Sequence, residues 1–486
     1  MSEPTTNHVT FDFAPQDFSR LGKQLTELML EAFEAERSEP VLTKISGPEL
    51  RALFDEPLPE KGCEPDDILS QWRDHVLPHC RRNGHPRFFG YVCTTADPLG
   101  VLADAMSSAL NQPVTAWRSA PAATEIERLA VRWLDTLVGF GGEGNGVLVS
   151  GGSSANFQGM ACAVSRAEER AGLPPGSRHR LSIYLSKEGH VSMRKAAQLL
   201  GVPPGQVRLL DIDEHRRLRP SELQRVLEED REAGLVPAMI GVSAGTANTG
   251  AIDPLDEVAE IAAENGVWLH VDGSYGAPAV ITEEYSWMAR AFSKADSLSL
   301  DPHKWLFAPV DAGCILIRDD RDAERAFTLF SEYTEITQTD PIERYALFDR
   351  GLEMSRRFRG LKVWTILKGR GVEGLRGAIS HDIALRKHLD QRVADDPRLE
   401  SLGSELSIAC FRYVPEQNQS GTAEDEETIA AVNRRILETL VSEGRCYMSP
   451  TTLEGRYSLR ACIVSFRTQI SDVDFLVDEV LRVGGG

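Results

Sequence analysis

The stretch PAMIGVSA (residues 237–244), followed by PLDEVAEIAAENG (254–266) and VWLHVD (267–272), sets the fold of this 486-residue chain. The first and third segments are apolar runs without polar alternation, whereas the middle segment carries its apolar residues at helical spacing. A strand without polar alternation is buried on both faces, which is typical of parallel sheets covered by helices. The three segments therefore predict a strand, a crossover helix and a parallel strand.

The same alternation of short apolar strands and amphipathic helices extends through residues 125–319. It predicts an α/β fold with a mainly parallel seven-stranded sheet and flanking helices. In such sheets ligands bind at the carboxyl ends of the strands. The other expected strands are GVLVS (146–150), RLSIYLS (180–186), VRLLDI (207–212), ADSLSL (295–300) and CILIRD (314–319).

Three regions are expected along the chain. Residues 18–33 carry one apolar stripe at helical spacing, and a helical arm over residues 1–95 has little sheet of its own, so it is expected to pack on a second subunit. Residues 96–365 form the large α/β domain. Residues 366–486 return to mixed helices and strands and predict a small α+β domain.

Charge and composition exclude several classes of function. The net charge of −20 repels phosphate backbones and anionic lipids, so neither nucleic acid nor a membrane surface is an expected partner. The chain starts without a signal-peptide pattern and has no run of 18 apolar residues, which favours a cytoplasmic location. Its eight cysteines show no metal-ligand spacing, so no metal site is expected.

Unusual polar residues stand at the ends of four expected strands. Ser153 and Ser154 open a helix after two glycines and could bind a phosphate, although serines also cap helices without a ligand. His190 precedes a helix, where an isolated histidine is more often a capping or core residue than a ligand contact. Asp272 ends an apolar strand and needs a cation or strong donors. Lys304 follows the fourth strand; if it enters a cleft, loss of water should lower its pKa, and otherwise it is a solvated loop lysine.

These four strand ends together match what pyridoxal phosphate requires. A lysine forms the Schiff base, a carboxylate keeps the ring nitrogen protonated, an imidazole stacks on the ring, and a helix start binds the phosphate.

Several motifs in order along the chain resemble the group II pyridoxal-phosphate-dependent amino acid decarboxylases, the family of the aromatic L-amino acid, glutamate, histidine and diaminobutyrate decarboxylases. The resemblance covers nearly the whole chain and implies a fold-type I architecture, a homodimer with its active site at the interface, and decarboxylation of an L-amino acid. It rests on HPRFFGY (85–91), WRSAPAATEIE (117–127), SGGSSAN (150–156), TANTGAIDPL (246–255), HVDGSYGA (270–277), DPHKW (301–305) and SRRFRGLKVW (355–364).

The resemblance also implies roles for individual residues. Lys304 would carry the cofactor, Asp272 would pair with the pyridinium nitrogen, and His190 would stack on the ring. The other cofactor contacts would come from Ser153, Ser154, Thr246 and His303.

A tyrosine on a mobile loop of the neighbouring subunit is associated with proton return in this family. The irregular segment 331–350 offers Tyr345, which the spacing favours, and Tyr333 as the alternative. Without a productive tyrosine the chain would be an aldehyde synthase. An aminotransferase of the same fold type, or a non-catalytic dimer, is a further alternative.

Departures from the family pattern leave the substrate open. Asp301 stands where some relatives have asparagine, Gly273 and Ser274 where many have alanines, and Thr115 where aromatic-selective members have bulky apolar residues.

Overall fold

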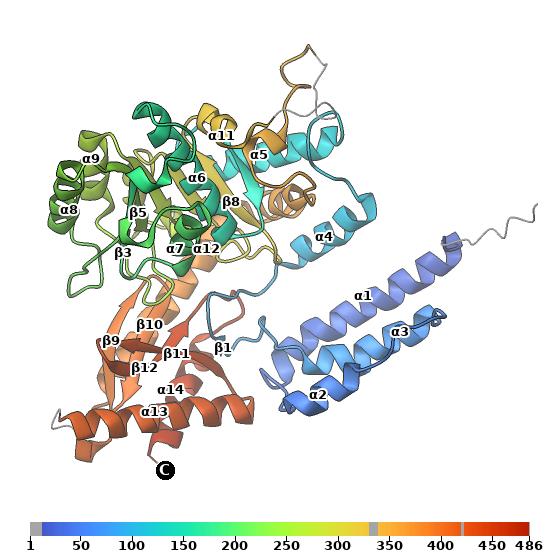
Figure 1. Ribbon diagram of the computed structural model, residues 1–486. Helices are drawn as coiled ribbons and strands as arrows, with labels where there is room; N and C mark the ends of the chain where they lie inside the picture. The colour runs from blue at the N-terminus through green and yellow to red at the C-terminus, as the bar shows by residue number, and fades with distance from the viewer. Residues whose placement is uncertain (1–11, 330–338, 419–421, 486) are drawn as a thin grey trace, which may run out of the picture.

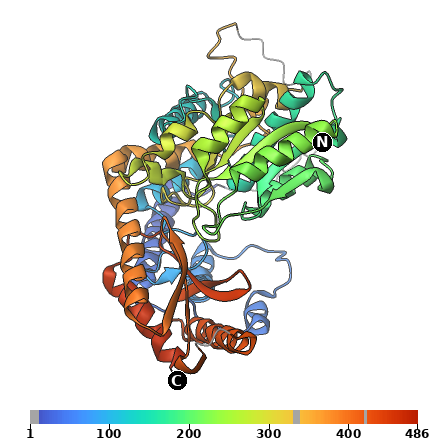
Figure 2. The same cartoon turned by 90° about the vertical axis from the view of Figure 1, so that its left-hand side faces the viewer.

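The computed structural model describes residues 12–329, 339–418 and 422–485. This part of the chain forms a large body around one sheet, a smaller sheet near the C-terminus, and a helical arm that projects to one side of the body (Figure 1). A view from the side shows the two sheets joined by one long helix (Figure 2).

The body is built on a seven-stranded sheet with the order β2-β8-β7-β6-β5-β3-β4. Strand β8 runs antiparallel to β2 and β7, and the other pairings are parallel. The predicted mainly parallel seven-stranded sheet is therefore confirmed. Its strands are β2 (Gly146–Val149), β3 (Leu181–Ser186), β4 (Val207–Leu210), β5 (Val236–Ser243), β6 (Trp268–Asp272), β7 (Ser297–Leu300) and β8 (Gly313–Ile317).

Helices cover both faces of this sheet, which explains why most of its strands show no polar alternation. One apolar cluster joins the sheet to α6, α7 and α11, and a second joins it to α5, α8, α9, α10 and α12. The helices of the body are α4 (Pro98–Leu110), α5 (Pro121–Val138), α6 (Gly152–Arg170), α7 (Val191–Leu199), α8 (Pro220–Glu232), α9 (Leu255–Asn265), α10 (Met288–Phe292) and α11 (Asp320–Phe327).

The arm consists of α1 (Pro15–Ser38), α2 (Gly47–Phe54) and α3 (Pro65–Gln71), followed by short turns of helix. Leu28 of the expected apolar stripe is buried, whereas Phe18 at the start of α1 is 67% exposed. Within one chain the arm thus leaves part of its apolar surface uncovered.

The long helix α12 (Arg359–Asp395) links the body to the second sheet and is interrupted by the non-helical backbone of Gly371. The second sheet has the order β1-β11-β12-β10-β9 and packs against α13 and α14. The strands and helices of this region are β1 (Phe88–Phe89), β9 (Leu399–Glu405), β10 (Ile408–Tyr413), β11 (Tyr447–Leu453), β12 (Arg456–Cys462), α13 (Ala423–Glu443) and α14 (Ile470–Gly484). The expected domain boundary between residues 365 and 366 falls inside α12. The strand β1 comes from the expected N-terminal arm and joins the sheet of the C-terminal region.

Within the described ranges, no helix combines the length and the apolar character that crossing a membrane requires.

Candidate active site

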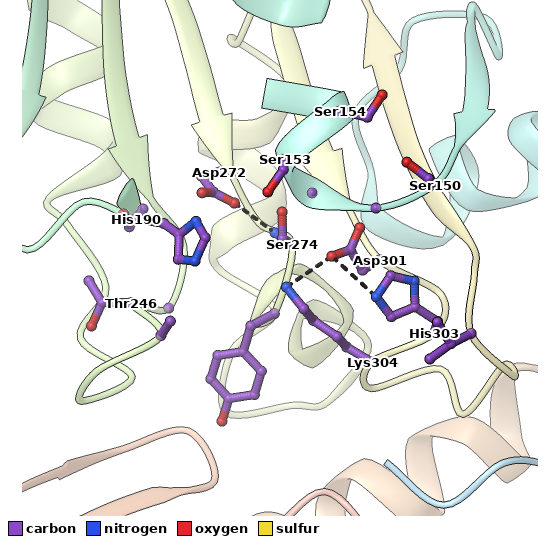
Figure 3. A pocket seen from close by; sticks show the side chains of 17 residues that line it. Ser150, Ser153, Ser154, His190, Thr246, Asp272, Ser274, Asp301, His303 and Lys304 are labelled. Atoms are coloured by element: carbon purple, nitrogen blue, oxygen red, sulfur yellow. Dashed lines mark hydrogen bonds and ion pairs between the residues drawn. The ribbon is translucent and has the colours of Figure 1, made fainter. Parts of the chain in front are cut away.

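A cavity of about 360 Å³ opens at the carboxyl ends of the parallel strands, as expected for an open α/β sheet. Side chains from the ends of β5 and β6, the loop after β7 and the starts of α6 and α7 line it (Figure 3). The structure brings seven of the sequence-predicted residues to this cavity: Ser153, Ser154, His190, Thr246, Asp272, His303 and Lys304.

Lys304 lies in the loop after β7, with its Nζ 2.9 Å from Oδ2 of Asp301. Burial disfavours the ammonium, but the carboxylates of Asp301 and Asp272 outweigh burial, so the pKa of Lys304 is raised above its ordinary value. The expected fall of this pKa is therefore wrong for the protein without cofactor. The carboxylate of Asp301, three residues earlier, offsets the effect of burial.

Asp272 is the last residue of β6 and is 7% exposed. Its Oδ1 accepts hydrogen bonds from Ser274 N (3.2 Å) and Ser299 Oγ (3.1 Å), and its Oδ2 accepts one from Asn156 Nδ2 (2.8 Å). Burial alone would raise the pKa of Asp272, but Lys304 and these donors lower it below its ordinary value. The cavity therefore holds a buried carboxylate that is kept ionised.

The start of α6 forms the wall of the cavity next to β2. Its N-cap is Gly151, which has no side chain to accept the first N–H groups of the helix. A Cβ atom at position 152 would lie 2.3 Å from Ser274 Oγ, so glycine is needed there. Ser153 and Ser154 add hydroxyl groups to this helix start. Free N–H groups and the helix dipole make such a site suitable for a phosphate.

Two histidines face the cavity from opposite walls (Figure 3). His190 is the N-cap of α7, and its Nδ1 lies 2.8 Å from Ser192 Oγ. The Nδ1 of His303 accepts a hydrogen bond from Ala312 N (3.0 Å), and burial is the main cause that lowers the pKa of His303. Both imidazoles are thus held in fixed orientations by short local contacts.

The structure does not bring Tyr345 to this cavity. Its ring packs between the guanidinium groups of Arg128 (4.4 Å) and Arg350 (4.2 Å), and its carbonyl oxygen accepts a hydrogen bond from Trp117 N (2.9 Å). Burial raises the pKa of Tyr345 to about 12. This geometry gives Tyr345 a packing role within its own chain. The alternative, Tyr333, lies outside the described residues.

Asn156 and His270 lie behind the cavity lining next to Asp272, and reasoning from the sequence missed both. Asn156 donates to Asp272 from the second turn of α6, and His270 lies two residues before Asp272 on β6. The two-residue period of a strand indicates that His270 and Asp272 share a face, so that signal was present. The contact with α6 depends on the tertiary packing.

The residues around the cavity fit pyridoxal phosphate. The ionised, buried carboxylate of Asp272 suits a protonated ring nitrogen. The primary amine of Lys304, in the same cavity, suits the aldehyde carbonyl of the same ligand. The uncapped start of α6 suits the phosphate.

Comparisons with known proteins agree with this geometry. The pyridoxal-dependent decarboxylase conserved domain matches residues 48–414. An aromatic-L-amino-acid decarboxylase of Bacillus atrophaeus is 33% identical over 94% of this chain and 93% of its own length. A phenylacetaldehyde synthase of Petunia hybrida is 30% identical over 95% of this chain and 92% of its own.

A solved structure of Oryza sativa TDC with pyridoxal phosphate and tryptamine superposes with a TM-score of 0.91 at 28% identity, covering 98% of this chain and 99% of that one. Tryptophan decarboxylase of Catharanthus roseus in complex with L-tryptophan gives 0.88 at 29% identity, with the same coverage. The chain therefore belongs to the pyridoxal-dependent decarboxylase family, and its cofactor is pyridoxal phosphate.

Proposed function

We propose that this chain converts an aromatic L-amino acid into its amine and carbon dioxide, with Lys304 as the residue that binds the cofactor covalently. The observation that carries the proposal is the meeting of Lys304 and the ionised Asp272 in one cavity at the strand ends. The relatives named above, which match over more than nine tenths of the chain, support an aromatic side chain.

The charges around the cavity also support a substrate with an uncharged side chain. Lys304 is the only lysine or arginine among the described residues that line it. A second carboxylate, as in glutamate, would have no guanidinium to pair with inside this chain's own cavity, and burying an unpaired charge is costly.

Each residue of the site has a separate task in this proposal. Bound pyridoxal phosphate supplies the ring that accepts the electrons of the breaking carbon–carbon bond. Asp272 holds a proton at the ring nitrogen, the start of α6 binds the phosphate with Ser153 and Ser154, and His190 covers one face of the ring. Thr246 and His303 close the walls of the cavity and limit how the ligand can turn.

We further propose that the protein is a cytoplasmic homodimer. Apolar side chains at helical spacing on α4 are exposed in the single chain, namely Leu102 (58%), Met106 (53%) and Leu110 (43%), and the arm exposes more. Exposed apolar surface of this extent is typical of a subunit interface. All eight cysteines are free, which is typical of proteins in a reducing compartment.

A second function, oxidative conversion to an aldehyde, is favoured by one specific observation. The phenylacetaldehyde synthase of Petunia hybrida matches over 95% of this chain. If no group returns a proton to the α-carbon, oxygen can react there in its place.

One experiment tests both functions. Purified protein with pyridoxal phosphate is incubated with tryptophan, tyrosine, phenylalanine, 3,4-dihydroxyphenylalanine, glutamate and diaminobutyrate, and carbon dioxide, amine, aldehyde and peroxide are measured from each reaction. Amine equal to carbon dioxide with an aromatic substrate supports the first function, and aldehyde with peroxide supports the second. Release from glutamate or diaminobutyrate alone would refute the proposed substrate class.

A further inference from the structure

A chain of buried polar side chains lies behind the cavity and centres on Asn156. The amide group of Asn156, which is 1% exposed, donates to Asp272 Oδ2 (2.8 Å) and to Ser192 Oγ (2.9 Å). Its Oδ1 lies 2.9 Å from Nε2 of His270. Ser192 in turn lies 2.8 Å from Nδ1 of His190. One side chain thus connects the carboxylate that faces the cofactor with the histidine that faces it from another wall.

The hydrogens on the His270 side of Asn156 can be assigned from the partners. His270 is fully buried, and burial lowers its pKa to about 4, so its ring is neutral with a single N–H. Trp268 Nε1 can only donate, and it donates to Ser297 Oγ (2.8 Å), so the Ser297 hydroxyl is free to donate to His270 Nδ1 (2.8 Å). The N–H of His270 is therefore at Nε2 and points to the carbonyl oxygen of Asn156.

The orientation of the Asn156 amide follows from this assignment. Turning the amide over would place its carbonyl oxygen against the carboxylate of Asp272 and its NH₂ group against the N–H of His270. Both contacts would then be repulsive. The amide is therefore fixed with both of its hydrogens directed at Ser192 and Asp272.

The His190 side can be assigned in the same way. Ser192 Oγ accepts from Asn156, so its own hydrogen is directed at His190 Nδ1, which also accepts from Ser192 N (3.3 Å). Because both neighbours of this nitrogen are donors, the N–H of His190 is at Nε2.

Space for the network is provided by α6 itself. A Cβ atom at Gly159, one turn after Asn156, would lie 2.8 Å from Nδ1 of His270 and 3.2 Å from Ser297 Oγ. A larger residue would push the imidazole away from the amide.

We propose that Asn156 is a positioning residue that couples two cofactor contacts: it holds the carboxylate of Asp272 aimed at the ring nitrogen, and through Ser192 it fixes the Nε2–H tautomer of His190. The inference rests on the proposed cofactor contacts of Asp272 and His190. Asn156 does not line the cavity, and it acts only through these neighbours.

The test compares Asn156→Ala, Ser192→Ala and the double variant with the wild type. Asn433→Ala is the matched control, since Asn433 is equally buried and makes three hydrogen bonds (2.8–2.9 Å), but in the C-terminal region against Tyr413 and Ile429. For each protein we would measure the dissociation constant of pyridoxal phosphate, the pH midpoint of the bound cofactor's absorption change, kcat, KM and the melting temperature.

Asn156→Ala should lower kcat roughly 10- to 100-fold with little change in KM, since a hydrogen bond to a charged group is lost. The pH midpoint should move by roughly one unit, which corresponds to a tenfold change in proton affinity. The Ser192→Ala loss should be smaller, and in the double variant the losses should be less than multiplicative. Asn433→Ala should change the melting temperature only.

The inference would be overturned if Asn156→Ala keeps the wild-type kcat, pH midpoint and cofactor affinity and only its melting temperature falls, as in Asn433→Ala. So would strictly multiplicative losses in the double variant. If Asn156→Ala does not fold, Asn156→Ser replaces it in the same comparison with the same criteria. A wild type that binds the cofactor but decarboxylates none of the amino acids refutes the proposed function alone, because cofactor affinity and the pH midpoint still test the coupling.

Discussion

Replacing Asp272 with asparagine tests the electron-accepting role of the site most directly. The carboxylate receives three hydrogen bonds, from Ser274, Ser299 and Asn156, at 2.8–3.2 Å. Both oxygens of Asp272 accept hydrogen bonds, but asparagine has only one oxygen. Its NH₂ group would therefore point at an N–H or O–H donor of a neighbour, and that hydrogen bond would be lost. Asparagine also lacks the charge that holds a proton at the ring nitrogen.

The size of the effect follows from these lost contacts. Removing a charge-assisted partner that acts in the transition state costs about 2 to 4 kcal/mol, which lowers kcat about 30- to 900-fold. The cofactor should still bind, because Lys304 and the start of α6 are unchanged. The main loss is therefore expected in kcat and not in cofactor content.

The assay is carbon dioxide release under saturating substrate, together with the absorption spectrum of the bound cofactor. Asp253→Asn serves as the control: Asp253 is a buried carboxylate that accepts two backbone N–H groups (both 2.7 Å) but does not line the cavity. It should affect the melting temperature and leave kcat close to that of the wild type. An Asp272→Asn protein with kcat within threefold of the wild type, and a normal cofactor spectrum, would refute the role assigned to Asp272.

Four further predictions follow from named residues. Borohydride reduction should place the cofactor adduct on Lys304, and Lys304→Ala should form none; an adduct on another lysine contradicts the assignment. Asp301→Asn should shift the pH dependence of covalent cofactor capture to lower pH, because the carboxylate 2.9 Å away raises the pKa of Lys304; an unchanged or higher midpoint argues against this. Tyr333→Phe should abolish amine formation in favour of aldehyde and peroxide, while Tyr345→Phe keeps the amine yield; the opposite pattern would assign proton return to Tyr345. Burial lowers the pKa of His85 from 6.5 to about 4, so between these values only the unfolded chain takes up a proton at this histidine, and stability should fall as the pH falls from 6.5 toward 4. The melting temperature should therefore depend less steeply on pH in His85→Asn. An equal slope in the two proteins excludes this histidine as a cause.

The sheet could be predicted from the sequence because its physical requirement is local. A parallel strand covered on both faces must be apolar throughout, and β5 and β6 carry that pattern in their own residues. The clustering of Asp272 with Lys304 followed from the same reasoning, since the carboxyl ends of neighbouring parallel strands meet at one edge. The contacts that the sequence did not predict depend on longer-range packing.

Tyr345 shows why such packing could not be predicted. Its segment has no periodicity, so only its distance along the chain from later motifs suggested a position. The path of the chain is determined instead by contacts with α5 and α11, through Arg128 and the pairing of Arg350 with Asp320. In the same way, the raised pKa of Lys304 depends on the orientation of Asp301, and the sequence alone does not fix that orientation.

The two steps of the proposed reaction, loss of carbon dioxide and return of a proton, depend on different groups. In the proposed reaction, loss of carbon dioxide needs only a ring that accepts electrons, and the residues proposed to support it, Lys304 and Asp272, line one cavity of one chain. Amine and aldehyde formation share this first step, so it does not decide between them. Amine forms only if a group returns a proton to the α-carbon. Among the described residues that line the cavity, Tyr275, His190 and His303 carry an aromatic or imidazole group that could do so. Tyr275 is bound to Ser407 and buried against Trp305, which removes it from this role. Amine formation therefore depends on a proton from Lys304, His190, His303 or a tyrosine of the 331–350 segment, and the paired tyrosine variants distinguish the segment from the other groups.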